Sequence, residues 1–351
     1  MSSSDKDLPQ SLLMTCVLRR LGYFVELKVP LFVPSYVEKY RRIPASDVDV
    51  IGIRFDSAFS HELAVAECKS GGHEGLDEVL KLQGVRDLLE ARRAYFIKAR
   101  VHANAREVAR KLDIVCFEAH RLSEYAARLG IDVDRDLELE RRYVADRGDM
   151  EGKLSKDGAA LTYAAGEFWS REYWENIHNL IYLARPVVGE STPPLTQHLQ
   201  FMVIRLASLL CISVLTMCSA VLNSGIDDIS RAVEVFLFGG PQARRQQERL
   251  LDELRKAVPR AKALPPGVNP PFTPLLTELA ARLVLSPDQA RATPTVFGSL
   301  LRCVVSADWA TVTEAKYDEV TLKLTKDVCE FLLASVGLTK PAAYLPEVFG
   351  L

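Results

Sequence analysis

The sequence lacks the short motifs that mark several large enzyme classes. It contains no GxxxxGK[ST], no GxGxxG and no GxSxG. Their absence argues against a built-in nucleotide motor, a Rossmann domain and a serine hydrolase. His61 and Glu62 do not begin an HExxH zinc motif, because position 65 is a valine.

Cysteines and long apolar segments are also scarce. The seven cysteines are scattered, odd in number and never spaced as CxxC, which fits reduced thiols in a cytoplasmic protein. The polar start, MSSSDKDLPQ, has no apolar core of a secretory signal. One uncharged run, Leu206 to Leu222, contains four hydroxyl residues. We interpret this run as the buried central helix of a helical domain, and we do not expect membrane binding.

Neither sign of charge dominates. The 351 residues include 44 basic and 46 acidic side chains, for a formal net charge of -2, so any basic surface for nucleic acid must be local. The length favours two domains. We expect one at 1–136, a helical linker at 137–165, and an all-α domain at 166–351 for recognition, oligomerisation or partner binding.

The first 120 residues alternate helical and strand-like patterns. We expect helices at 8–21, 74–91 and 104–112, and strands at 23–29, 47–55, 62–69, 94–99 and 113–117. This α-β-β-β-α-β-α-β order predicts a mixed sheet flanked by helices. After about position 137, helical patterns recur between Pro/Gly-rich breaks such as PPGVNPPFTP. The fold expected is an α/β domain followed by an all-α domain.

The stretch HELAVAECKSG, residues 61–71, is an apolar strand that ends in two charges. Glu67 and Lys69 share a face because strand side chains alternate. The preceding strand begins SDVDVIG and places Asp47 and Asp49 on a common face. If the strands form a hairpin, a carboxylate from each converges beside Lys69. Two carboxylates and a backbone carbonyl suit Mg²⁺, and the lysine can orient water or stabilise negative charge.

A less specific interpretation is also open. The two strands can form a half-exposed edge hairpin in which Asp47, Asp49, Glu67 and Lys69 make solvated ion pairs. That interpretation leaves the acids without a purpose among valine and alanine, so we rank it lower.

The pattern of Asp49 followed by Glu67-Cys68-Lys69 resembles the PD-(D/E)XK nuclease superfamily, which has the restriction-endonuclease-like fold. It is most similar to Mrr-type restriction enzymes and archaeal Holliday-junction resolvases, over roughly residues 8–120. The resemblance implies that Asp49 and Glu67 hold Mg²⁺ or Mn²⁺, with the backbone carbonyl of Cys68 as a further ligand. It also implies that Lys69 is catalytic and that Gln83, on the following helix, positions Lys69 or a phosphate.

The chain departs from the family pattern in two places. Val48 stands where the family name has proline, and the helix expected at 8–21 carries no acid. Members often have a glutamate on that helix, and Glu26 on the next strand is a candidate substitute.

Several basic residues near the site are candidate DNA contacts, because phosphates are neutralised by such groups. They are Arg41, Arg42, Arg92 and Arg93, together with His73 on the turn after Lys69. A second basic stretch, 244–262, is a candidate for contact with nucleic acid or a partner. The alternative for each is an ordinary solvated surface.

The function implied by the resemblance is a Mg²⁺-dependent DNA endonuclease that uses in-line attack by water, without a covalent intermediate. A role in restriction or phage defence follows by family analogy, ahead of DNA repair. The expected partners are DNA and either a second copy or a defence-system protein. The alternative is a catalytically inactive nuclease-fold module that binds DNA or acts as a scaffold, with the helical domain mediating assembly. A ribonuclease is a third option.

Overall fold

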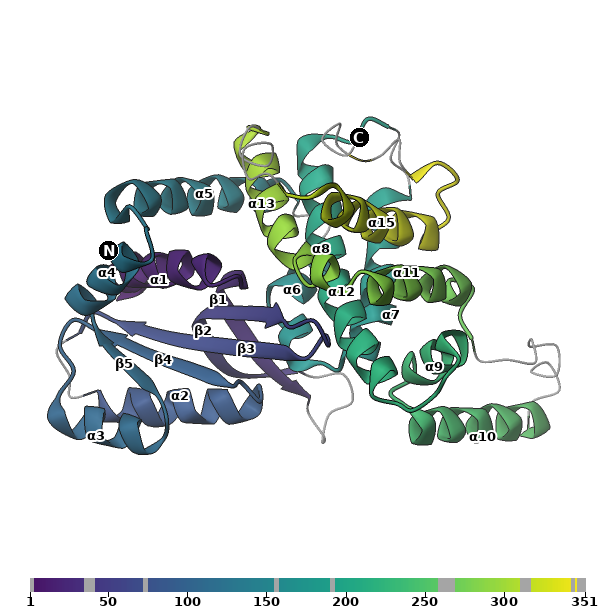
Figure 1. Ribbon diagram of the computed structural model, residues 1–351, viewed down its shortest axis with the longest axis horizontal. Helices are drawn as coiled ribbons and strands as arrows, with labels where there is room; N and C mark the ends of the chain where they lie inside the picture. Colours follow the sequence, from purple (N-terminus) through teal and green to yellow (C-terminus); the bar gives the residue numbers. More distant parts are fainter. Residues whose placement is uncertain are drawn as a thin grey trace. The chain divides into compact units, whose positions relative to one another are not determined.

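The computed structural model describes residues 3–34, 42–71, 75–154, 158–189, 193–257, 269–309, 317–341 and 345. The chain divides into two compact units. The first comprises Met1–Phe55, His61–Ser170 and Pro294–Ala315, and the second comprises Asp56–Ser60, Arg171–Thr293 and Lys316–Leu351. A mixed five-stranded sheet lies in the first unit, and the described part of the second is helical (Figure 1). The expected α/β part followed by a helical part is therefore confirmed.

The sheet has the strand order β1-β2-β3-β4-β5. Its strands are β1 (Phe24–Pro34), β2 (Arg42–Phe55), β3 (His61–Lys69), β4 (Arg93–Lys98) and β5 (Val115–Glu118). The first three are antiparallel neighbours, whereas β4 and β5 run parallel to β3. Parallel neighbours need crossover connections, which here contain α2 (Leu76–Leu88) and α3 (Ala103–Lys111). The predicted order of helices and strands is confirmed.

Helices cover both faces of this sheet, as Figure 1 shows. One face packs against α1 (Ser3–Arg20) and α4 (Ala119–Arg128). Its core contains Val17 and Leu18 of α1 against Val50 and Ala66 of the sheet, all nearly fully buried. The α2 helix lies on the other face, as its contacts with β3 and β4 show. Because side chains alternate along a strand, the residues next to Val50 and Ala66 in the sequence point toward the opposite face, which α2 covers.

Four further segments of the first unit lie within the described residues. They are α5 (Val133–Lys153), α6 (Gly158–Ala165), the 3-10 helix η2 (Glu167–Ser170) and α13 (Thr293–Ser306). The α13 helix follows more than a hundred residues of the second unit, yet the Thr295 hydroxyl lies 3.5 Å from the Gly22 carbonyl oxygen. The expected division at 136, with a linker at 137–165, stays a prediction, while the compact units change over near Ser170.

The second unit contains seven described helices. They are α7 (Tyr173–Val188), α8 (Gln197–Leu222), α9 (Ile229–Phe236), α10 (Pro241–Ala257), α11 (Thr273–Leu285), α12 (Pro287–Ala290) and α15 (Glu319–Ser335). Among the described residues, α8 is the one helix long and apolar enough to cross a membrane, but 94% of its apolar window is buried inside the protein. The apolar run is therefore a core helix, as expected, and this is consistent with a soluble protein.

Glycine is required where α6 meets η2. A Cβ added at Gly166 would overlap the carbonyl oxygen of Pro30 on β1, whereas a Cβ added at Gly148, within α5, meets open space. We expect Gly166→Ala to lower the free energy of unfolding by about 1–3 kcal/mol, through overpacking. Gly148→Ala should raise it by about 0.5–1 kcal/mol, because glycine is a poor residue inside a helix.

Urea unfolding, followed by circular dichroism, measures both glycine variants under the same conditions. The close approach of this segment to β1 is contradicted if the two substitutions change the unfolding free energy in the same direction.

Candidate functional site

The candidate site lies where β2 and β3 stop pairing. Their antiparallel register ends at the pair Val50–Ala66. Beyond that pair, β2 continues beside β1 and β3 continues beside β4. The next position carries Asp49 on β2 and Glu67 on β3, and residues opposite each other on antiparallel strands share a face. The two carboxylates therefore flank the point at which the strands separate.

Lys69 lies within ion-pair distance of both carboxylates. Its Nζ atom is 2.8 Å from Oε1 of Glu67 and 3.4 Å from Oδ2 of Asp49. The same Oδ2 accepts a hydrogen bond from the Cys68 N–H, at 2.8 Å. The backbone pairing of β2 with β3 has already ended at this position, so the Asp49 side chain accepts the hydrogen bond of the Cys68 N–H. The structure brings Asp49, Glu67, Cys68 and Lys69 together.

The cluster is shielded from water, and its electrostatics follow from that burial. The side chains of Glu67, Asp49 and Lys69 are 6%, 16% and 29% exposed. Burial raises the pKa of Glu67, and the charge of Asp49 raises it further, against the opposing effect of Lys69.

Lys69 stays positively charged despite its partial burial. Burial by itself lowers its pKa, but the hydrogen bond to Glu67 and the charges of Glu67 and Asp49 outweigh that effect. The net result is a pKa above the ordinary value for lysine. Lys69 is therefore suited to stabilising negative charge and unsuited to accepting a proton.

Asp7 is a site residue that the sequence pattern missed. Its Oδ1 accepts a hydrogen bond from the Ser70 N–H at 2.6 Å, and its charge helps to raise the pKa of Lys69. Asp7 lies on α1, which begins at Ser3 rather than at position 8. The first turn is polar and has no apolar periodicity, so the sequence pattern placed the start of the helix later than it is. The preference of acids for helix N-termini is the signal that could have extended it.

The donor set suits a small divalent cation. Asp49 and Glu67 offer carboxylate oxygens, and the Cys68 carbonyl projects to the same side of the strand as the N–H that reaches Asp49. Such a set matches the few protein oxygens that Mg²⁺ takes when water and substrate complete its octahedron. In the described residues, no three or more His, Cys, Asp or Glu side chains form a metal-binding group. A cation here would depend on two carboxylates.

Two other residues singled out from the sequence have partners outside this cluster. The Gln83 Nε2 donates a hydrogen bond to Oδ1 of Asp87 at 2.7 Å, and its buried Oε1 accepts none. Glu26 is 3% exposed and lies 2.8 Å from Nη1 of Arg147 on α5. Within the described residues, neither side chain is seen in contact with Lys69. That Gln83 positions Lys69 or a phosphate, and that Glu26 replaces the acid of the first helix, stay predictions.

The candidate DNA contacts lie away from the cluster or outside the described residues. Arg93 pairs with Ala64, three positions before Glu67 and so on the opposite face of the sheet. Arg92 and Arg93 lie 4.0 Å and 3.6 Å from carboxylate oxygens of Glu62. Arg42 is the first residue of β2, seven positions before Asp49. Arg41 and His73 lie outside the described residues.

Two further lysines lie on the same face as the cluster; Lys98 is one of the basic residues that the sequence placed near the site, and Lys81 was not singled out. Lys81 of α2 is 2.9 Å from Oδ1 of Asp47. Lys98 is paired with Lys69 across β3 and β4, and its nearly buried Nζ lies 3.4 Å from Oε1 of Glu78. Each of these ammonium groups is therefore paired with a carboxylate of the same face.

Comparison of the chain with protein-family models, with curated proteins and with solved structures gives no match. The case for a function therefore depends on the geometry of the site and on the residue pattern that forms it.

Proposed function

We propose that this protein is a divalent-metal-dependent deoxyribonuclease with a restriction-endonuclease-like domain. The observation that carries the proposal is the convergence of Asp49, Glu67 and Lys69 at the point where β2 and β3 separate. Charges are costly to bury unless they are paired or hold a metal. A site with two acids and a lysine on one face has the components needed for phosphodiester hydrolysis.

Each group has a distinct task in the proposed reaction. Asp49, Glu67 and the Cys68 carbonyl would hold Mg²⁺ or Mn²⁺, which when bound lowers the pKa of water and polarises the phosphate. Water adds to phosphorus in line with the bond to the leaving oxygen. The attacking water loses a proton as it adds, the P–O bond to the leaving oxygen breaks, and the departing alkoxide takes up a proton to form the alcohol. The Lys69 ammonium stabilises the negative charge that grows on the phosphate oxygens.

The residue pattern and its setting both support this choice. Asp49 followed by Glu67-Cys68-Lys69, in an α-β-β-β-α-β frame, resembles the PD-(D/E)XK nucleases. By analogy alone, we extend the proposal to an endonuclease of restriction or phage defence acting in the cytoplasm. All seven cysteines are free thiols, which fits a reducing compartment.

One observation favours the non-catalytic alternative, a nuclease-fold module that binds DNA or acts as a scaffold. Lys69 already lies within ion-pair distance of both carboxylates, so it offsets one of their two negative charges without a metal ion. An activity assay separates the two. Supercoiled plasmid, linear duplex DNA and RNA are each incubated with the protein and Mg²⁺, Mn²⁺ or EDTA. We expect metal-dependent cleavage of DNA. No cleavage of any nucleic acid would favour the scaffold, and cleavage of RNA alone would identify a ribonuclease.

Metal binding can be tested without activity. At free Mn²⁺ about one hundred times its dissociation constant, binding should stabilise the wild-type protein by ~2.7 kcal/mol. Asp49→Asn should remove most of this gain, because it replaces a charged ligand by a neutral one. The matched control is Asp47→Asn, on the same strand, whose side chain is 75% exposed and paired with Lys81. Thermal unfolding with Mn²⁺ or EDTA provides the measurement. Equal gains for wild type and Asp49→Asn would contradict the ligand assignment.

A further inference from the structure

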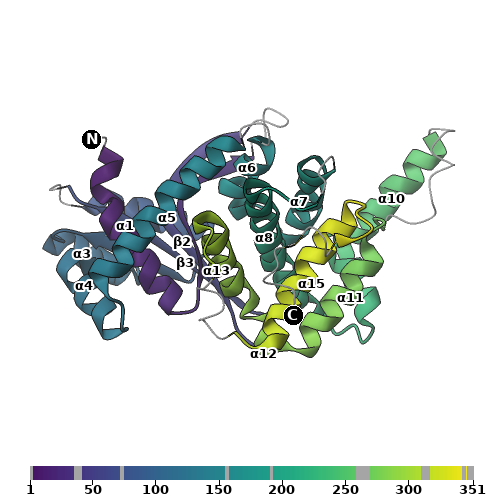
Figure 2. The same cartoon turned by 90° about the horizontal axis from the view of Figure 1, so that it is seen from above.

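Helix α10 of the second unit presents an apolar stripe to solvent. Its apolar members are Ala243, Leu250 and Leu254, which share one helical face with the polar Gln247. Leu250 is 58% exposed and Leu254 is 47% exposed, and no residue of α10 is buried. Figure 2 shows this helix projecting from the other helices of its unit. Two leucines one turn apart in water indicate a surface that is covered in another state of the protein.

The first turn of α10 is firmly attached, so the projecting part is held in a defined direction. The Nη1 atom of Arg244 lies 2.7 Å from the Glu234 carbonyl oxygen on α9 and 2.7 Å from Oδ1 of Asn269. Its guanidinium also lies 5.1 Å from the ring centroid of Phe238. A helix ordered in this way loses little conformational entropy when it binds.

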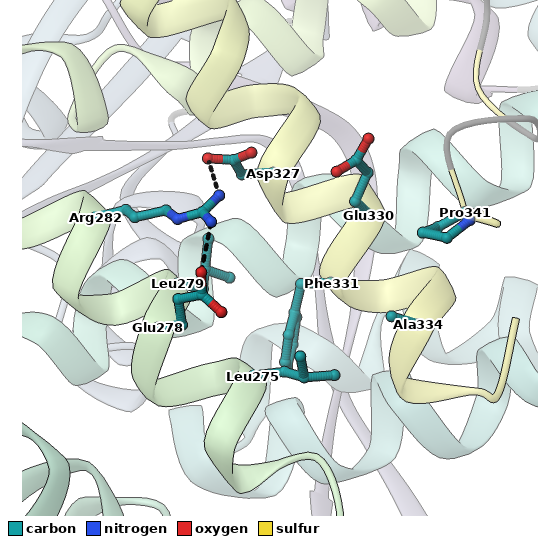
Figure 3. Close-up of a pocket in the computed structure, with 9 residues that line it drawn as sticks. All are labelled: Leu275, Glu278, Leu279, Arg282, Asp327, Glu330, Phe331, Ala334 and Pro341. Carbon is teal, nitrogen blue, oxygen red and sulfur yellow. Dashed lines mark hydrogen bonds and ion pairs between the residues drawn. The ribbon is translucent and has the colours of Figure 1, made fainter. Parts of the chain in front are cut away.

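A groove between α11 and α15, in the same unit, has complementary chemistry (Figure 3). Its apolar lining comes from Leu275, Leu279, Phe331, Ala334 and Pro341. Its polar lining has three carboxylates, on Glu278, Asp327 and Glu330, and one guanidinium, on Arg282.

Arg282 organises the acidic rim of this groove. Its guanidinium lies 2.6 Å from Oε1 of Glu278 and 2.9 Å from Oδ2 of Asp327, as the dashed lines in Figure 3 show. With one guanidinium against three carboxylates, the rim retains an excess of negative charge. It therefore favours a ligand that is apolar at its centre and basic at its edges.

We propose that this groove receives α10 of a second copy of the chain, and that the exchange is reciprocal and closes a two-fold dimer. The helix carries five basic and three acidic side chains, opposite in sign to the groove. Leu250 and Leu254 are one turn apart, as are Leu275 and Leu279 on the groove wall. Reciprocal exchange yields a closed assembly instead of a filament. Binding of α10 to nucleic acid would leave both leucines in water. The inference does not depend on the proposed nuclease activity.

Two complementary variants test the docking. The stripe variant combines Leu250→Asp with Leu254→Asp, and the groove variant combines Leu275→Arg with Glu330→Arg. Each should weaken self-association at least about a hundredfold, through lost apolar burial or charge repulsion. Leu139→Asp, at a position 50% exposed on α5 of the first unit, is the control. Circular dichroism and thermal unfolding check that each variant is folded.

Light scattering after size exclusion at micromolar concentration provides the measurement. Wild type and Leu139→Asp should have twice the chain mass of 39.1 kDa, and each double variant alone should be monomeric. An equimolar mixture of the two variants should return to the dimer mass, because the groove of one and the helix of the other are intact.

Three outcomes would overturn the proposal. The first is a monomeric wild type, whether or not added DNA shifts its elution. The second is a groove variant that remains dimeric, which would indicate pairing of α10 with α10. The third is a mixture that stays monomeric although wild type is a dimer.

Discussion

Glu67→Gln should lower metal-dependent DNA cleavage by about a thousandfold while the protein stays folded. The substitution removes a charged metal ligand, and losses of this order follow the removal of single electrostatic groups from active sites. Folding should be retained, because burial and the charge of Asp49 already raise the pKa of Glu67 and so oppose its charged form. Initial rates of plasmid nicking, at equal protein concentration with Mg²⁺ or Mn²⁺, provide the measurement.

Lys69→Met separates catalysis from metal binding. Lys69 is a cation and not a ligand, so its loss should lower the cleavage rate by about a hundredfold or more but leave stabilisation by Mn²⁺ intact. Glu67→Gln should lose both. The matched control for the glutamate is Glu107→Gln, which changes a half-exposed residue on α3 paired with Arg110. Wild-type rates in both site variants would end the case for catalysis at this cluster.

Glu140→Ala should destabilise the protein by about 3–5 kcal/mol, the usual cost of leaving buried charges without their partner. Glu140 of α5 is 2% exposed and forms ion pairs with Arg19 of α1 and Arg302 of α13. Both guanidinium groups also lie within 6 Å of the Tyr143 ring centroid, at 5.8 Å and 5.7 Å. Burial, with the added repulsion of Arg19, lowers the pKa of Arg302 to about 9. Without Glu140, two partly buried cations would face each other.

The matched control for Glu140 is on the same helix. Glu138 is 46% exposed and pairs only with neighbours on α5, Arg141 and Arg142, in the described structure. Glu138→Ala should therefore leave the free energy of unfolding nearly unchanged. Urea unfolding of both variants compares them directly. Similar small effects for the two would show that the link between α1, α5 and α13 contributes little to stability.

Local patterns predicted the elements of the first unit well, because each has a clear period and a clear end. The strand expected at 62–69 is β3, His61–Lys69, and the helix expected at 104–112 is α3, Ala103–Lys111. The alternation of side chains along a strand is also sufficient to place Glu67 and Lys69 on one face. Asp7 was missed, because a polar first turn carries no periodic signal.

Other features depend on contacts between residues far apart in the sequence. Nothing local to 294–306 indicates that α13 belongs with the first unit, because the ion pair of Arg302 and Glu140 joins positions more than 150 residues apart. Arg93 was expected near the site from its position in the sequence. The register of β3 and β4 instead places it on the face of the sheet opposite to Glu67.

By itself, the sequence determined which residues form helices and strands and which charges share a strand face, since both follow from periodicities of two and 3.6 residues. The tertiary structure alone decided that β2 and β3 separate just where Asp49 and Glu67 lie. It also decided that Asp7 reaches Ser70 and that α10 is left uncovered. These depend on register and packing between distant segments, which local patterns do not encode.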